Sequence, residues 1–146
     1  MAHYKLILAY DGTAYNGFQR QAIKISVQAT VEEALRRLGW TGRAVMPAGR
    51  TDSGVHAAGQ VISFNLDWRH SDETLANALN AFLPQDISVR QAEKVDEAFH
   101  PRYDAIARTY RYRLYEARTR DPQLDRFAWR LDRMPVMKVM QTASDD

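Results

Sequence analysis

Cysteine is absent from the 146-residue sequence, which excludes disulfides, thiolate metal ligands and thiol nucleophiles. Long apolar runs are absent too, since no stretch approaches the roughly 18 residues of a membrane-spanning helix. The apolar stretch before Asp11 is short, so we expect no secretory signal. A chain of this kind fits a reducing compartment, and we expect a cytoplasmic protein.

Signals for a bound metal or nucleotide are also missing. Gly49 and Gly54 have the glycine spacing of a phosphate-binding loop, but Val55 and His56 stand where that loop needs lysine and serine or threonine. This excludes a nucleoside triphosphatase of that class. The four histidines show no metal-ligand spacing, so no metal site is expected. His56 is interpreted as a loop-packing or hydrogen-bonding residue in preference to the alternative, a catalytic one.

What remains is the composition of one ordinary globular domain, with 45% hydrophobic and 26% charged residues. Residues 3–11 alternate so that one face of a strand would hold Tyr4, Leu6, Leu8 and Tyr10. Further strands are expected over 43–49, 58–66, 86–95 and 106–116. Helices are expected after the N-caps Ser26 and Ser71, with inward faces formed by Val27, Val31, Leu35, Leu38, Leu75, Leu79 and Phe82.

The order of these elements is β-α-β-β-α-β followed by an extra strand. It predicts an α+β fold of the ferredoxin-like, RRM-like plan, an antiparallel sheet with both helices on one face. RNA-binding modules use the same plan. A last helix is expected after Asp132 as N-cap, with Pro135 in its first turn and an inner face of Met137, Met140 and Ala143. That pattern runs for only about two turns without a stop signal, so we expect the sequence to continue.

An arginine-rich stripe interleaved with tyrosines lies between residues 100 and 120. Its arginines are Arg102, Arg108, Arg111, Arg113, Arg118 and Arg120, and its tyrosines are Tyr103, Tyr110, Tyr112 and Tyr115. Cations that meet phosphate and rings that stack on bases suit a nucleic-acid surface. A solvated edge strand that carries arginine for solubility explains the stripe equally well. In either case Tyr110, Tyr112 and Leu114 would share one strand face.

A charged trio, Arg50-Thr51-Asp52, lies on a glycine-flanked turn between two expected strands. In an extended chain, residues two apart point to the same side, so Arg50 would lie beside Asp52. An adjacent arginine favours the ionised carboxylate, which is the form that a nucleophile needs. A structural salt bridge that pins the turn is the competing interpretation, and the spacing alone slightly favours it.

Four stretches together resemble one family, the bacterial tRNA pseudouridine synthase A family. They are "YDGTAYNGFQRQ", "AGRTDSGVHAAGQV", "NALNAFLP" and "FHPRYDAIARTYRYRLY". The order and spacing agree, and "GRTDSGVHA" is the most specific of the motifs. The resemblance runs from Tyr4 to about Leu131 and covers the first half of a family member. In that family a second, similarly folded half forms the other wall of the active cleft.

The resemblance implies a role for each singled-out residue. Asp52 would be the catalytic aspartate, Arg50 would pair with it and help extrude the target nucleotide, and Tyr110 would lie against the uracil ring. Contacts to RNA are expected from Arg102, Arg108, Arg111 and Arg113. Residues 1–131 would form the half that carries the nucleophile, and 132–146 would begin the connection to a second half.

The implied activity is an isomerase that converts uridine to pseudouridine in the tRNA anticodon arm, at positions 38 to 40. It needs no cofactor, because no group is lost and no net redox change occurs. The implied partners are tRNA and a second copy of the chain, and residues 1–146 alone are expected to be inactive. The alternative is a non-catalytic, ferredoxin-like RNA-binding module, although no RNP1-like stretch is present. A glycosidase is less favoured, because no flanking pair of carboxylates is evident.

Overall fold

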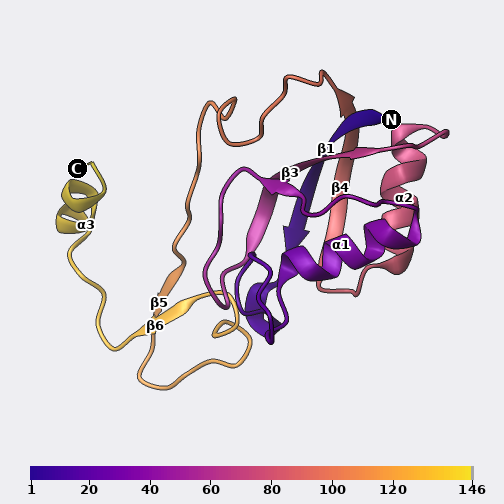
Figure 1. The fold of residues 1–146 in the computed structure, drawn as a ribbon. Helices are drawn as coiled ribbons and strands as arrows, with labels where there is room; N and C mark the ends of the chain where they lie inside the picture. The colour runs from indigo at the N-terminus through magenta and orange to yellow at the C-terminus, as the bar shows by residue number, and fades with distance from the viewer. Residues whose placement is uncertain (146) are drawn as a thin grey trace. The chain divides into compact units, whose positions relative to one another are not determined.

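The computed structural model describes residues 1–145, which form two compact units, Met1–Ala107 and a second unit that begins at Arg108. The first unit contains β1 (Ala2–Tyr10), α1 (Val27–Arg37), β2 (Met46–Pro47), β3 (Ala57–Leu66), α2 (Asp72–Phe82) and β4 (Ile87–Val95). Its strands form one antiparallel sheet in the order β2-β3-β1-β4. Figure 1 shows α1 and α2 over the same face of this sheet. The ferredoxin-like α+β fold expected from the sequence is therefore confirmed.

The core lies between the sheet and the two helices. Along β1 the burial alternates as expected, and Tyr4, Leu6, Leu8 and Tyr10 are all buried. They join one apolar cluster with residues of both helices, among them Val31, Leu35, Leu75 and Leu79. Each fully buried aliphatic side chain contributes about 1.5–3 kcal/mol, so the burial of one face of β1 stabilises the sheet against the helices.

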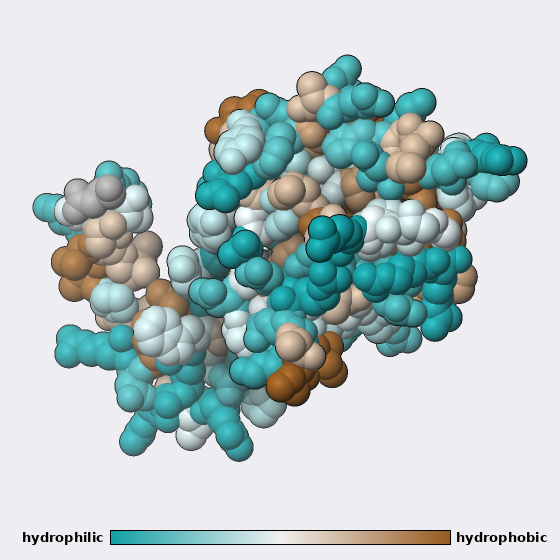
Figure 2. Space-filling model, viewed as in Figure 1, coloured by the Kyte–Doolittle hydropathy of each residue, from teal (hydrophilic) through white to brown (hydrophobic). Residues whose placement is uncertain are grey.

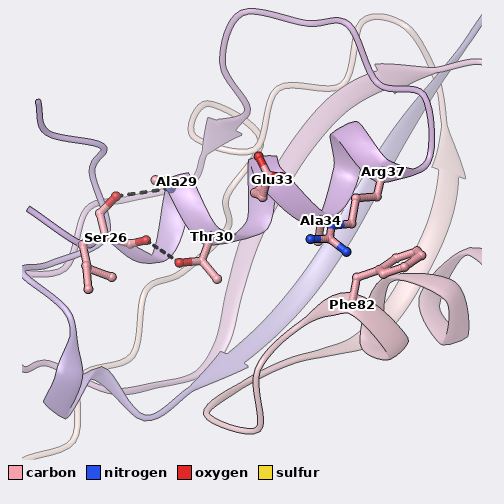
Figure 3. Close-up of a pocket in the computed structure, with 8 residues that line it drawn as sticks. Ser26, Ala29, Thr30, Glu33, Ala34, Arg37 and Phe82 are labelled. Carbon is pink, nitrogen blue, oxygen red and sulfur yellow. Dashed lines mark hydrogen bonds between the residues drawn. The ribbon is translucent and has the colours of Figure 1, made fainter.

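Both helices begin at the predicted caps. The Ser26 hydroxyl accepts a hydrogen bond from the Ala29 N–H at 3.2 Å, as Figure 3 shows, and Ser71 does the same for Thr74. Such caps stabilise a helix by about 1 kcal/mol each. The expectation that Phe82 points inward is wrong, because it is 45% exposed at the last position of α2. Leu83, the next residue, is buried instead, because the chain leaves the helical path there.

The two edges of the sheet differ from each other. The predicted strand 43–49 is shortened to β2, which contains only Met46 and Pro47. Along the opposite edge, side chains of α2 reach the backbone of β4. Asn80 donates to the Val89 carbonyl at 2.9 Å and accepts from the Val89 N–H at 2.7 Å. Asp72 accepts from the Lys94 N–H at 3.0 Å.

The second unit contains the short parallel strands β5 (Leu114–Glu116) and β6 (Trp129–Leu131), followed by α3 (Met137–Ser144). The predicted strand 106–116 is thus correct only for its last three residues. The expected helix begins later than predicted, because Val136 is its N-cap and Asp132 instead pairs with Arg130 at 2.5 Å.

The predicted inner face of α3 is also wrong for the chain as described, since none of its residues is buried. Met137, for example, is 76% exposed, because residues 108–145 supply no layer that covers this helix. Among residues 1–145, no helix has both the length and the apolar character needed to cross a membrane. Figure 2 shows hydrophilic residues over most of the viewed face, with a few hydrophobic groups at the surface.

Candidate active site

The Asp52 loop, residues 48–56, connects β2 to β3. Arg50 and Asp52 are both exposed on it. An ion pair requires a basic nitrogen within 4.0 Å of a carboxylate oxygen. Within the described residues 1–145, no cationic side chain lies that close to the Asp52 carboxylate. The pairing of Arg50 with Asp52 that the resemblance implies is therefore not made in this structure. What the loop offers is a solvent-facing carboxylate, which is free to approach a bound substrate.

Backbone hydrogen bonds fix the loop on both sides of Asp52. The Thr51 carbonyl accepts from the Phe18 N–H at 3.0 Å. The Tyr15 carbonyl accepts from the Gly54 N–H at 3.1 Å and from the Ser53 hydroxyl at 3.3 Å. Residues 15–18 are thus a bed on which the Asp52 loop rests. Because the bonds lie one and two residues from Asp52, the position of its backbone is set before any ligand binds.

Close approach between the two segments requires glycine at two positions of the "YDGTAYNGF" stretch. A Cβ atom on Gly12 would lie 2.0 Å from the Val55 carbonyl oxygen, closer than any real contact. Gly17 has φ +81°, where other residues are strained, and its Cβ would lie 2.8 Å from the Thr51 carbonyl oxygen. These glycines let the two backbones touch.

Two buried tyrosines connect this region to the sheet. The Tyr10 hydroxyl at the end of β1 lies 2.7 Å from the Thr51 hydroxyl, and burial raises the pKa of Tyr10. The Tyr15 hydroxyl donates to the Asp86 carboxylate at 2.6 Å in the connection between α2 and β4. Burial first, and then this carboxylate, raise the pKa of Tyr15. Both phenols therefore stay neutral and act as fixed hydrogen-bonding groups.

His56 closes the loop against the start of the 3-10 turn Gly12–Ala14. Its Nδ1 accepts from the Gly12 N–H at 3.0 Å, and an Asp11 carboxylate oxygen lies 3.2 Å from the same nitrogen. The hydrogen-bonding role predicted for His56 is confirmed. No group of three or more metal-ligating side chains is found within the described part of the chain.

The other predicted site residues are exposed. Tyr110 belongs to the second unit and is 72% exposed in the irregular segment before β5, so the predicted strand face of Tyr110, Tyr112 and Leu114 is wrong. The chain leaves the strand conformation because only residues 114–116 have a partner strand, β6. The arginines singled out for RNA contacts are likewise exposed, namely Arg102, Arg108, Arg111 and Arg113.

A surface pocket of about 350 Å³ lies between α1 and the end of α2. Figure 3 shows Arg37 of α1 beside Phe82, whose ring centroid is 5.5 Å from the Arg37 guanidinium carbon. The lining comes from Ile25, α1 and Phe82 and includes no residue of the Asp52 loop. This pocket is therefore separate from the candidate active site.

Sequence reasoning found the Asp52 loop but missed the bed beneath it. Tyr10 was assigned only to a strand face, and Tyr15 and Asp86 had no assigned role, since their contacts join parts of the chain up to 71 residues apart. The glycines of the "YDGTAYNGF" stretch were the available signal, because an unusual density of glycine indicates close backbone approach.

Comparison with known proteins gives a consistent result. The model of a family described as tRNA pseudouridine synthase matches residues 6–104. The tRNA pseudouridine synthase A of Geotalea daltonii is 39% identical over 141 residues, which cover 97% of this chain and 58% of the relative. That of Limosilactobacillus reuteri is 38% identical over 149 residues, 100% and 58% of the two chains. That of Pseudothermotoga lettingae is 41% identical over 129 residues, 88% and 53%.

The chain therefore spans just over half the length of these relatives. The family match includes both segments that build the candidate site, the bed at 15–18 and the loop at 48–56. With a family model that matches residues 6–104 and similarity along nearly all of its length, this chain belongs to the tRNA pseudouridine synthase family.

Proposed function

We propose that this chain is the part of a tRNA pseudouridine synthase that carries the nucleophile, and that Asp52 is that nucleophile. The observation that carries the proposal is the exposed Asp52 carboxylate on a loop whose backbone is held by hydrogen bonds at Thr51, Ser53 and Gly54. A nucleophile on a loop whose backbone is held in advance needs less reorganisation when it attacks, which is how preorganised groups lower a barrier. The proposed substrate is uridine at positions 38 to 40 of the tRNA anticodon arm.

The chemistry needs only one such carboxylate. The N1–C1′ bond of uridine breaks, the uracil turns, and C5 bonds to C1′. The proton on C5 is lost and N1 gains one, so atoms and electrons balance without a cofactor. Asp52 would form a covalent adduct, at either ribose C1′ or uracil C6, that holds the intermediate while the base turns. The target base must first leave the stack, at a cost of a few kcal/mol.

The remaining parts of the proposal concern the partners. We propose that Tyr110 stacks on the extruded base, a contact worth about 1–3 kcal/mol, and that Arg50 helps extrude it. The arginines Arg102, Arg108, Arg111 and Arg113 would neutralise phosphates. We further propose action in the cytoplasm on tRNA as a homodimer, as the family resemblance implies.

A second candidate function is a non-catalytic RNA-binding module. It is favoured by one observation, that the chain spans only 58% of relatives such as that of Geotalea daltonii. A nucleophile open to bulk water lacks the dry surroundings that strengthen electrostatic stabilisation of a transition state. If a second wall of the cleft is required for turnover, residues 1–146 alone would bind RNA without turning it over.

The decisive experiment measures tritium release from C5-labelled uridine in tRNA. Residues 1–146 are assayed alone and then with the C-terminal portion of the Geotalea daltonii relative that lies beyond the match. We expect no turnover from the chain alone and turnover after mixing. Turnover by the chain alone would show that it carries a complete site. Binding without turnover in both assays, from a folded chain, would favour the RNA-binding module.

The role proposed for Tyr110 predicts different results for two substitutions. Tyr110→Phe keeps the ring and should bind tRNA nearly normally, whereas Tyr110→Ala should weaken binding about 5- to 150-fold, because 1–3 kcal/mol of stacking is lost. Tyr112→Ala is the matched control, since Tyr112 is 87% exposed two residues away. Binding titrations with tRNA give the comparison. Unchanged binding and turnover in both Tyr110 variants would remove this residue from the site.

Neutralising Arg111 and Arg113 together should flatten the salt dependence of tRNA binding. Each lost phosphate contact reduces the slope of log K against log salt by roughly 0.9 on a duplex, so the pair should reduce it by about 1.8. The control removes the same charge by neutralising Arg69 and Lys94, two exposed cations of the first unit. Equal slopes in the two double variants would mean that the stripe acts only through net charge.

A further inference from the structure

We propose that Glu32, a carboxylate buried in α1, is a positioning residue for Asp52. Through its side-chain contacts, Glu32 would hold together the two chain segments that meet at the Asp52 loop. The catalytic consequence rests on the proposed function, whereas the mechanical consequence does not. The chemistry proposed for the site has no other use for the Glu32 carboxylate.

Glu32 is fully buried, and both of its oxygens are engaged. Its Oε2 accepts from Arg20 Nη1 at 2.7 Å, and Arg36 Nη2 lies 3.6 Å away. Its Oε1 accepts from Gln28 Nε2 at 2.9 Å and from the Val45 N–H at 3.1 Å. A buried carboxylate is costly to desolvate, and a well-packed apolar residue often serves stability as well. The role of Glu32 is therefore better judged from the segments that its contacts join than from stability.

The partners of Glu32 come from both sides of the candidate site. Arg20 ends the segment whose residues 15–18 form the bed of the loop. Val45 immediately precedes the two-residue strand β2, and the Asp52 loop begins directly after β2. Arg20 also donates to the Arg43 carbonyl at 3.2 Å, so the two segments are joined a second time. One carboxylate thus fixes the bed and the entry of the loop to the same helix.

A short path of hydrogen bonds leads from Glu32 to Asp52. Gln28, which contacts Glu32, accepts from the Arg20 N–H through its side chain at 2.9 Å. The Gln28 N–H donates to the Phe18 carbonyl at 2.9 Å, and the Phe18 N–H donates to the Thr51 carbonyl at 3.0 Å. Thr51 directly precedes Asp52. Loss of charge at Glu32 should therefore loosen the bed and, through it, the position of Asp52 on the loop.

The test compares Glu32→Gln with Glu33→Gln in the 146-residue chain. Glu33 neighbours Glu32 on α1, but its side chain is 63% exposed and reaches Arg36 only at 3.8 Å, so it is a matched control. Amide hydrogen exchange is followed by NMR at Phe18 and Gly54, which bond to the loop and its bed, and at Leu6 in the sheet. In Glu32→Gln we expect exchange at Phe18 and Gly54 to accelerate about tenfold more than at Leu6. Glu33→Gln should change none of them.

Equal acceleration at all three amides would overturn the proposal, because it would show a general loss of stability. No acceleration at Phe18 and Gly54 would overturn it as well. If Glu32→Gln does not fold, Arg20→Lys replaces it, since lysine keeps the charge but loses the guanidinium contact to Arg43. The same two amides should then exchange faster than Leu6, and the same equal acceleration would count against the proposal.

A second measurement uses the chain assembled with the C-terminal portion of the relative. Glu32→Gln should lower kcat about tenfold or more and leave the KM for tRNA within about twofold, because the displaced group acts in the chemical step. A rise in KM with unchanged kcat would contradict a positioning role. If the assembled protein shows no turnover even before substitution, the proposed function fails, while the exchange experiment still decides whether Glu32 holds the loop.

Discussion

Replacing Asp52 by asparagine is expected to abolish conversion of uridine to pseudouridine and to leave thermal unfolding unchanged. An amide of the same shape cannot supply the negative oxygen that forms a covalent adduct. Folding should be unaffected, because the carboxylate is exposed and has no ion-pair partner among residues 1–145. No other effect predicted for this protein is larger, since it removes the reaction rather than slows it.

The measurement is tritium release from C5-labelled tRNA in the assembled protein, together with a thermal unfolding curve. Asp67→Asn is the control, because it removes one exposed carboxylate of the same unit outside the loop. The control should retain activity. Retained turnover in Asp52→Asn would rule out Asp52 as the nucleophile, and a lowered unfolding temperature would mean that the carboxylate has a structural role.

Gly12→Ala is expected to have the largest effect among substitutions outside the Asp52 loop. The added methyl group would lie 2.0 Å from the Val55 carbonyl oxygen, so a backbone segment must move. Overpacking of this kind costs about 1–3 kcal/mol, and the loss of chain entropy in the unfolded state returns less than about 1 kcal/mol. The steric cost therefore prevails, and the free energy of unfolding should fall.

Activity should fall with it, because the Val55 N–H donates to the Asp52 carbonyl at 3.1 Å. A displacement of about 1 Å at a reacting group costs on the order of 100-fold in rate. Urea denaturation and the tritium assay check the two effects. Gly59→Ala is the matched control, since its Cβ would meet only an Ile7 methyl group at 3.9 Å. Equal stability of the two variants would show that the loop yields without cost.

The elements that sequence predicted well are those with a strong local pattern. The alternation in β1 and the serine caps of α1 and α2 are properties of neighbouring residues, and the structure repeats them. The stretch 106–113 carries an equally good strand pattern, yet it lies outside any strand. A strand needs a partner to bond with, and partner availability is not encoded in the stretch itself.

The same difference between local patterns and long-range contacts applies to the candidate site. Arg50 and Asp52 stood out because a glycine-rich turn does not need an arginine. The glycines before Phe18 indicated a close backbone approach, but the partner of that approach could not be predicted, since the bond from Phe18 to Thr51 joins residues 33 apart in a loop without periodicity. Glu32 has no place in the apolar pattern of α1, and only its burial reveals that it faces inward.

The side chains of α2 that reach β4 bear on how the protein behaves at high concentration. Unpaired backbone N–H and C=O groups along a sheet edge can pair with strands of other molecules, and this is a common route to aggregation. The Asn80 side chain hydrogen-bonds to the N–H and the carbonyl of Val89, and the Asp72 carboxylate accepts from the N–H of Lys94. These bonds interrupt the row of unpaired backbone groups along β4. At the other edge β2 is two residues long, and Pro47 has no N–H to offer. Both edges are therefore less open to an intruding strand, so molecules crowded together during synthesis should join sheet to sheet less readily.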